Sequence, residues 1–206
     1  MTDDLFQTIV ERGRELPDVE FKRGGPITNN HLLRRVLRAV LGMTNSQNGG
    51  AVILGIEERD GQTVLAGLSE MDAATWTNDA FGDKCADWVD PAISVDIEIK
   101  FYRDSRFVVI DVAEFDEAPV FARKGFLSTS NDMVLRAGAL YVRGVRKPET
   151  VEVQTAEDMR RLLSLALEKQ LAHFYRLATA AGYIPAPPST PPDDVRFTEQ
   201  ERDFSS

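Results

Sequence analysis

A short apolar run directly after two glycines constrains the fold of this chain most strongly. The run comprises Ala51–Ile56 and follows Gly49 and Gly50. Glycine lets the backbone reverse where a side chain would clash, and a short apolar run bounded by a turn is typical of a strand covered on both faces. Glu57 and Glu58 follow the run, at the strand end where open α/β sheets often place their chemistry. We therefore expect a buried strand that delivers carboxylates to the edge of a sheet.

Two helices are expected before this run. Residues 3–14 carry apolar side chains at helical spacing and end before Pro17, which cannot continue a helix. Residues 30–44 show the same spacing over a longer stretch, and Asn29 or Asn30 supplies a capping side chain. Each helix is predicted to bury one face against the rest of the protein.

Between these helices, residues 18–23 are expected to form a strand. Successive side chains of a strand point to opposite faces. Val19 and Phe21 are therefore predicted to face one way, and Glu20 and Lys22 the other. The strand would present a carboxylate and an ammonium group side by side.

The remainder of the chain continues to alternate between strand and helix patterns. Thr155 and Asp158 resemble a capping box at the start of the last helix. Strands are predicted over residues 63–66, 93–101, 107–112, 119–123 and 133–142, and helices over residues 72–89 and 155–181.

The chain has 206 residues and a formal net charge of −9. This length suits one domain with a complete core plus a tail, and we place the domain at residues 1–181. Residues 182–206 are rich in proline and acidic side chains, which predicts a disordered tail or a linker to a longer protein. The net acidity disfavours a protein that coats nucleic acid through bulk charge, but a local basic groove is compatible with it.

Membrane and secretory signals are not found in the sequence. No apolar run approaches the ~20 residues needed to span a bilayer, and the N-terminus lacks the basic and apolar regions of a signal peptide. Cys85 is the only cysteine, so an internal disulfide is impossible and a reducing environment suits the chain. We expect a cytoplasmic protein with no membrane partner.

The Glu20–Lys22 pair suggests half of a metal-dependent phosphodiesterase site. Mg²⁺ and Mn²⁺ prefer carboxylate and water oxygens, and such an ion can activate water for attack on phosphorus. A nearby cation can stabilise the oxyanion that develops. Glu15 and Glu58 are available as further carboxylates.

These residues, in this order, resemble the Schlafen AlbA-like domain family. The resemblance covers about residues 10–180, and its strength lies in order and spacing rather than in any one motif. The segments that carry it are Glu15, Glu20-Phe21-Lys22-Arg23, the helix that follows, Asn48–Glu58, Pro91, the strand at Phe107, Pro119 and Tyr141-Val142-Arg143-Gly144.

The resemblance implies an α+β fold in which helices flank a mixed β-sheet, with a long C-terminal helix. It also implies nucleic-acid binding. Some Schlafen members cleave tRNA and other structured RNA with three acidic residues and a divalent cation. By motif, those acids correspond to Glu15, Glu20 and Glu58, with Lys22 beside them. We therefore expect an endonuclease that uses Mg²⁺ or Mn²⁺ and acts on RNA in preference to DNA.

Two departures from the family pattern bear on this expectation. The acidic pair at the strand end is usually Asp-Asp, whereas this chain has Glu57-Glu58. Each side chain is one methylene longer, which changes the geometry available to a metal. The helix before the glycines usually ends in Ala-Phe-Ala-Asn-Thr, and residues 42–46 keep only part of that motif.

Basic side chains are candidates for contacts with phosphate groups, which supply much of the affinity of such proteins. Schlafen nuclease regions form a cleft from two copies of the domain, and this chain has one, so the resemblance implies a homodimer. The candidate nucleic-acid contacts are Arg23, Arg34, Arg35, Arg38, Arg143, Arg146 and Lys147.

Each candidate also has a purely structural interpretation. Glu15 would be a solvated charge at a helix end, Glu20 and Lys22 a surface pair of little energetic value, and Glu58 a residue that flanks a hairpin turn. The arginines near residue 35 would form a solvated helix face. The alternative function is therefore a non-catalytic module, for DNA or RNA binding or for dimerisation, within a larger regulatory or defence protein. A third possibility is a protein-interaction domain without nucleic acid.

Overall fold

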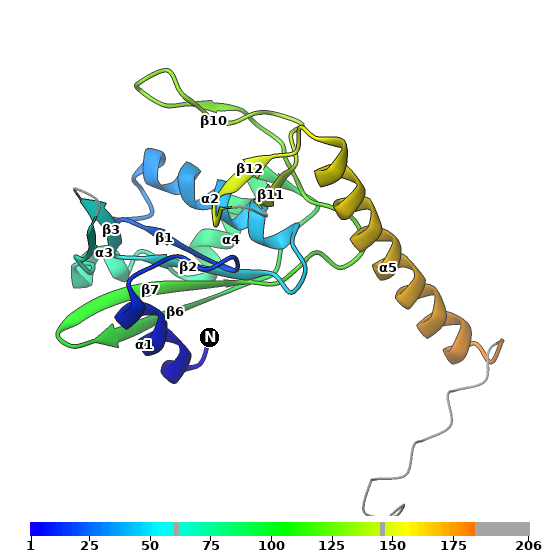
Figure 1. Cartoon of the computed structure of the whole chain (residues 1–206), viewed down its shortest axis with the longest axis horizontal. Coiled ribbons are helices and arrows are strands. Elements are labelled where there is room, and N and C mark those ends of the chain that lie inside the picture. Colours follow the sequence, from blue (N-terminus) through cyan, green and yellow to red (C-terminus); the bar gives the residue numbers. More distant parts are fainter. Residues whose placement is uncertain (60–61, 145–146, 184–206) are drawn as a thin grey trace, which may run out of the picture. The chain divides into compact units, whose positions relative to one another are not determined.

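The computed structural model describes residues 1–59, 62–144 and 147–183. Its centre is a sheet in the order β1-β2-β7-β6, in which β1 and β2 are parallel and the other neighbours antiparallel (Figure 1). The predicted mixed sheet is confirmed. The strands of this sheet are β1 (Val19–Lys22), β2 (Gly50–Leu54), β6 (Val95–Tyr102) and β7 (Ser105–Val112).

Helices and short two-stranded ladders surround this sheet, so the fold class is α+β, as expected. The helices are α1 (Asp3–Arg12), α2 (Asn30–Thr44), α3 (Glu70–Ala73), α4 (Asn78–Trp88) and α5 (Ala156–Ala180). The ladders pair β3 (Ile56–Arg59) with β4 (Gln62–Leu65), β5 (Val89–Asp90) with β8 (Phe121–Ala122), β9 (Phe126–Leu127) with β10 (Met133–Leu135), and β11 (Tyr141–Arg143) with β12 (Thr150–Glu152).

The chain divides into two compact units, Met1–Lys169 and Gln170–Ser206. The predicted domain boundary at residue 181 stays a prediction. Residues 184–206 of the predicted tail lie outside the described residues. In the described part of the chain, no helix is both long and apolar enough to cross a bilayer.

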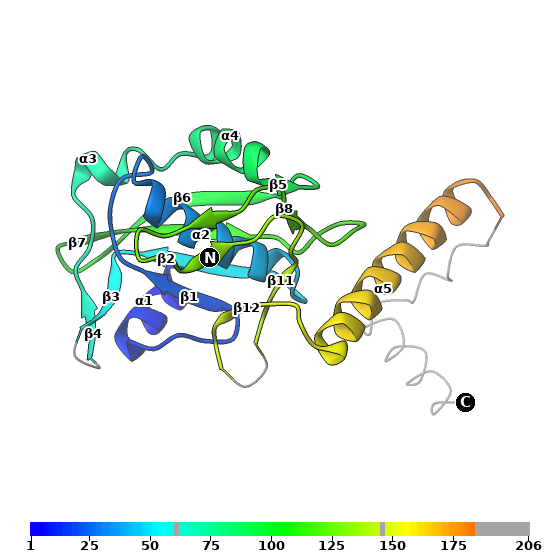
Figure 2. The same ribbon diagram turned by 90° about the horizontal axis from the view of Figure 1, so that it is seen from above.

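The central sheet separates two hydrophobic clusters. Val52 and Leu54 of β2 belong to the cluster under α2, whereas Ala51 and Ile53 belong to the cluster under α1. The two helices lie on opposite faces of the sheet, α2 above it and α1 below it in Figure 1, and Figure 2 looks down on the sheet from the side of α2. Strand β2 is therefore covered on both faces, as its continuous apolar run predicts.

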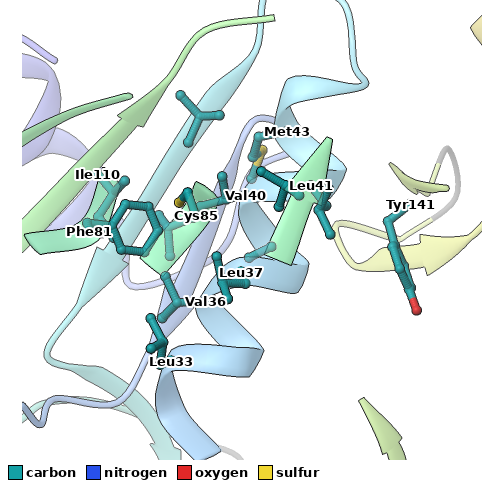
Figure 3. Close-up of a cluster of buried hydrophobic side chains, with 14 of the residues drawn as sticks. Leu33, Val36, Leu37, Val40, Leu41, Met43, Phe81, Cys85, Ile110 and Tyr141 are labelled. Carbon is teal, nitrogen blue, oxygen red and sulfur yellow. The ribbon is translucent and has the colours of Figure 1, made fainter. Parts of the chain in front are cut away.

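Helix α2 supplies the largest share of one cluster. Val36, Leu37, Val40 and Leu41 are completely buried, and they pack with Phe81 of α4 (Figure 3). The spacing of these residues produces one continuous apolar stripe, which is why the sequence predicts this helix so well. The side chain of Asn29 accepts a hydrogen bond from the Leu32 N–H at 3.1 Å and caps the helix.

The turn between α2 and β2 depends on its glycines. Gly49 has φ +68°, a conformation that strains other residues. A Cβ atom at this position would overlap the carbonyl oxygen of Val112. A Cβ on Gly50 would lie 2.6 Å from the carbonyl oxygen of Asp18. The glycines therefore allow the chain to reverse and also to pass close to neighbouring backbone.

Strand β2 is shorter than the apolar run. It ends at Leu54, and Gly55, with φ +104°, turns the chain into β3. Ile56 therefore begins the β3–β4 hairpin, which carries Glu57 and Glu58. The alternation of apolar side chains does not show this bend, because Ile56 is buried in either arrangement.

The predicted helix over residues 72–89 is in fact two helices. Helix α3 ends at Ala73, and α4 begins after Thr77, whose side chain accepts a hydrogen bond from the Ala80 N–H. Between them, the indole of Trp76 donates to the carbonyl of Gly25 at 2.8 Å. This capping threonine and the anchored tryptophan break the helix that the apolar spacing predicts. Cys85 is buried on α4, and burial raises its thiol pKa to about 12.

The outer edge of β1 is hydrogen-bonded by the chain itself. The N–H and C=O of Val19 pair with Leu16, at 3.1 and 3.3 Å. The N–H of Phe21 donates to Glu15 Oε1 at 2.7 Å, and the C=O of Phe21 accepts from Lys22 Nζ at 3.2 Å. The edge is short, and the backbone groups that Val19 and Phe21 direct away from β2 are hydrogen-bonded within the chain.

Candidate nucleic-acid interface

Strand β1 places its side chains as the alternation predicts. Val19 belongs to the cluster under α1, and Phe21 packs against it. Glu20 and Lys22 form an ion pair with each other. Glu20 is nevertheless only 7% exposed, so this pair lies within the fold and not on a solvated surface.

The carboxylate of Glu20 is fully engaged by other side chains. Oε1 pairs with the ammonium group of Lys22. Oε2 pairs with Arg143 Nη1 and accepts a hydrogen bond of 2.7 Å from the Thr150 hydroxyl. A buried carboxylate needs such partners, because an isolated charge is costly away from water. Glu20 therefore ties β1 to the β11–β12 ladder.

Arg143 also holds the turn that precedes β1. Its Nε donates to the carbonyl of Pro17 at 2.9 Å, and its Nη2 donates to that of Leu16 at 3.3 Å. Its side chain is 5% exposed. Arg143 thus links a C-terminal strand to the segment that carries Glu15.

Glu15 lies in the loop between α1 and β1 and is half-buried. The N–H of Phe21 occupies its Oε1 atom. Burial raises the pKa of Glu15 above its ordinary value, and the Phe21 N–H and the Lys22 charge only partly offset this. The carboxylate is therefore positioned by the edge of the sheet.

A pocket of about 720 Å³ lies beside Glu15. Glu58, which is exposed on β3, lines the same pocket, as does Lys22. Glu57 lines it too and pairs with Arg59. The pocket also has basic lining residues, and these are Arg14, Arg23, His31 and Arg35.

Glu20 does not line this pocket. It lines a smaller hollow of about 250 Å³, together with Arg35, Arg38 and Asp132. Lys22 and Arg35 line both cavities. The two cavities therefore adjoin at Lys22 and Arg35. Both cavities are lined by basic side chains and by carboxylates.

The three carboxylates expected to hold a metal ion do not all line the same cavity. Glu15 and Glu58 share a pocket, but both oxygens of Glu20 already bind cationic or hydroxyl groups. Within residues 1–59, 62–144 and 147–183, no group of three or more His, Cys, Asp or Glu side chains is placed to hold a metal ion. A divalent ion would have to displace Lys22 or Arg143 from Glu20.

The candidate arginines fall into two groups. Arg34 and Arg143 are buried. The guanidinium of Arg34 lies 3.6 Å from the centre of the Trp88 ring. Arg38 is intermediate, because it donates to the carbonyls of Val134 and Thr150 at 3.2 and 3.1 Å.

The other group faces solvent. Arg23, Arg35 and Lys147 are exposed, and the first two line the large pocket. Arg146 lies outside the described residues. Arg14 and His31 line the pocket although the sequence did not single them out as contacts; the position of Arg14 beside Glu15 was the available signal.

The protein is thus an α+β domain with a surface pocket lined by basic side chains and carboxylates. The Schlafen AlbA_2 family model matches residues 15–152, and the chain belongs to that family. This confirms the resemblance found in the sequence. Among curated proteins, none matches the chain.

Several solved structures resemble the chain, and two of them are described here. One is the DIP2311 protein from Corynebacterium diphtheriae, with 24% identity and a TM-score of 0.46; the match covers 69% of this chain and 23% of that protein. The other is the N-terminal domain of a protein from Nitrosomonas europaea described as related to the ATP-dependent DNA helicase RecG. It has 19% identity and a TM-score of 0.45, and the match covers 66% of this chain and 86% of that domain.

Proposed function

We propose that this domain binds nucleic acid through the phosphate backbone at the large pocket. Membership of the Schlafen AlbA_2 family supports binding of this kind. The observation that carries the proposal is the set of cations that line this pocket. Arg14, Lys22, Arg23 and Arg35 line it in a chain whose net charge is −9. Local positive groups of this kind supply backbone affinity without sequence readout.

Arg23 and Arg35 are the best positioned to reach phosphate. Both are exposed, so neither is committed to the interior as Arg34 and Arg143 are. Lys22 lies between the two cavities but also neutralises Glu20. We therefore assign the outer contacts to the two arginines, and to Lys22 a role that combines structure and binding.

Reversal of both exposed charges tests this assignment. Arg23→Glu/Arg35→Glu should weaken binding to labelled tRNA and to single-stranded RNA and DNA by at least about tenfold at low salt. The slope of log affinity against log salt should fall in magnitude by about 2, because about one counterion is released for each contact. Fluorescence anisotropy across a salt series measures both quantities.

A matched control changes the same net charge elsewhere. Arg103 and Arg176 are exposed and lie outside the pocket lining, so Arg103→Glu/Arg176→Glu should retain most of the affinity. Equal losses in the two double variants would show that bulk charge, not the pocket, drives binding. If the wild-type chain does not bind these probes at low salt, the proposal is wrong and a protein-interaction domain becomes the better interpretation.

We keep metal-dependent cleavage as a second candidate because Glu15, Glu58 and Lys22 line one pocket. The activity would be that of an endonuclease acting on tRNA-like RNA in preference to DNA, with Mg²⁺ or Mn²⁺. Glu15 and Glu58 would hold the ion, and Glu20 would have to give up existing partners to join them. A homodimeric cleft, as in Schlafen nuclease regions, likewise stays a prediction.

The second candidate predicts cleavage of labelled tRNA in Mn²⁺ that EDTA abolishes. Glu58→Gln is the appropriate variant, because Glu58 is exposed and its loss leaves the fold intact. It should lower the cleavage rate by at least about 100-fold if this carboxylate holds the ion. Retention of tRNA binding without cleavage by the wild type, in Mn²⁺ and in Mg²⁺, would leave the non-catalytic module as the function.

A further inference from the structure

Strand β6 forms the edge of the central sheet opposite β1 (Figure 2). It pairs with β7 along its whole length without a break in register. Successive residues of an antiparallel strand direct their backbone groups alternately toward one neighbour and away from it. The N–H of Ile97 donates to Asn78 Oδ1 of α4 at 2.8 Å. Ile97, Ile99 and Phe101 therefore direct their backbone groups away from β7.

The last part of this edge is open. Within the part of the chain that the structure describes, the N–H and C=O groups of Ile99 and Phe101 have no hydrogen-bond partner. The residues themselves are also uncovered, because Ile99 is 42% and Phe101 59% exposed. Asn78 closes the edge at Ile97, and the corresponding groups of β1 are bonded by the chain itself. An open, apolar edge of this kind is a template for an additional strand.

A lysine in an edge strand often protects that edge, but Lys100 does not have this effect here. Such a lysine protects because a strand that covers it leaves its charge without a partner. The side chain of Lys100 is 10% exposed, and its ammonium group already pairs with Asp3 at 2.7 Å and with Glu98 at 2.8 Å. A strand added beside Ile99 and Phe101 would therefore leave Lys100 paired.

The surface beside the open edge is acidic on the face toward α1. A cavity of about 540 Å³, which we call the edge cavity, is lined there by α1 and by residues 98–101. The side chains of Asp3 and Glu98 are 82% and 43% exposed, and Asp96 is exposed as well, whereas Lys100 is shielded. The carboxylates thus outnumber the cation, and a basic side chain is the complementary group.

The other face of this edge carries balanced charge. Arg106 lies 5.4 Å from the centre of the Phe101 ring and pairs with Glu70 at 3.7 Å. At the turn after β6, Arg103 is followed directly by Asp104. Neither place has a surplus of positive charge that would repel a basic partner.

We propose that β6 binds an extended, basic segment of a partner protein as an additional strand of the sheet. The backbone of that strand bonds to Ile99 and Phe101, and its alternate side chains are apolar and lie beside these two residues. The side chain between them points to the other face, where a lysine or arginine meets Asp3 and Glu98. A second copy of this chain would bring the same surplus of carboxylates, so the charge favours a different protein. The proposal is independent of nucleic-acid binding, because the large pocket is lined by β1 and not by β6.

Binding of two synthetic peptides to the full chain tests the proposal. A capped fluorescent peptide with the core Val-Lys-Val-Lys-Val should bind with a dissociation constant of about 10–100 μM in fluorescence anisotropy, as a short added strand does. The same peptide with glutamate in place of lysine should bind at least about tenfold more weakly. The basic peptide should also slow hydrogen exchange of the Ile99 and Phe101 amides, measured by NMR, because it occupies their N–H groups.

Three variants locate the binding site. Glu98→Lys should weaken binding of the basic peptide at least about fivefold and strengthen binding of the acidic one. Asp116→Lys makes the same change at an exposed position outside the edge cavity, so this matched control should keep the wild-type preference. Ile99→Pro removes an outward N–H but no bond to β7, and it should weaken binding of the basic peptide at least about tenfold. Thermal unfolding curves verify that each variant is folded, and the charge reversal decides the question if the proline variant is not.

Three results would overturn the proposal. The first is no binding of the basic peptide, or equal binding of both peptides. The second is binding that leaves the exchange of the Ile99 and Phe101 amides unchanged, because the peptide would then lie elsewhere on the acidic surface. The third is a dimer of the wild-type chain in analytical ultracentrifugation that Ile99→Pro dissociates and the peptide does not, because a second copy would then occupy the edge.

Discussion

Replacement of Arg143 by Met is expected to lower the free energy of unfolding by about 3–5 kcal/mol, the range found when one partner of a buried ion pair is removed. The substitution leaves the buried carboxylate of Glu20 with only Lys22 and Thr150 as partners. It also removes the donors to the carbonyls of Leu16 and Pro17. Urea denaturation followed by circular dichroism measures the loss.

Two comparisons make this prediction specific. Arg35→Met removes an exposed arginine from the same surface and should change stability by no more than about 0.5 kcal/mol, as surface substitutions generally do. The double variant Glu20→Gln/Arg143→Met should lose less than the sum of the single losses, because the groups form one network. A loss below about 1 kcal/mol for Arg143→Met would show that the network contributes little.

Gly49→Ala is expected to cost about 3 kcal/mol or more, since it combines a left-handed backbone conformation with a steric overlap. The φ angle of Gly49 is +68°, and the added methyl group would meet the carbonyl oxygen of Val112. Relief of that overlap requires β2 and β7 to shift at Gly50↔Val112, where they pair. Thermal and urea unfolding both report this loss.

Gly138→Ala is the matched control for Gly49→Ala. Gly138 has φ +77°, but no atom lies within 4 Å of the position of an added Cβ. This variant should therefore show only the conformational term, about 1–2 kcal/mol. Equal losses of stability in the two variants would mean that the overlap with β7 is relieved without cost. The backbone conformation alone would then explain why position 49 is a glycine.

Local patterns were sufficient to predict the centre of the fold. The apolar run predicts β2 because every side chain in it is buried, and the amphipathic stripe predicts α2 with its cap at Asn29. The bend at Gly55 was not predictable, because Ile56 is apolar in either arrangement. Alternation in β1 placed Glu20 and Lys22 on one face but could not identify Arg143, whose contact with Glu20 spans 123 positions in the sequence.

The candidate site shows the same limit. Arg34 and Arg35 are neighbours in sequence and identical in chemistry, yet one stacks on Trp88 in the interior and the other lines the pocket. Helical spacing shows that the side chains of Arg34 and Arg35 point in different directions from α2. Which of them meets the ring of Trp88 depends on how α4 packs against α2. Glu15 and Glu58 were expected to meet, and they line one pocket; whether they act as expected stays a prediction.

The self-bonded edge of β1 has a consequence for how copies of this chain can associate. An unprotected edge strand offers N–H and C=O groups to a strand from another molecule, which leads to sheet extension and aggregation. At β1, the backbone groups of Val19 and Phe21 are occupied by Leu16, Glu15 and Lys22. A foreign strand would have to displace all of these bonds at once. Glu15 therefore helps to keep this edge of the sheet closed to other chains, whatever chemistry the pocket performs.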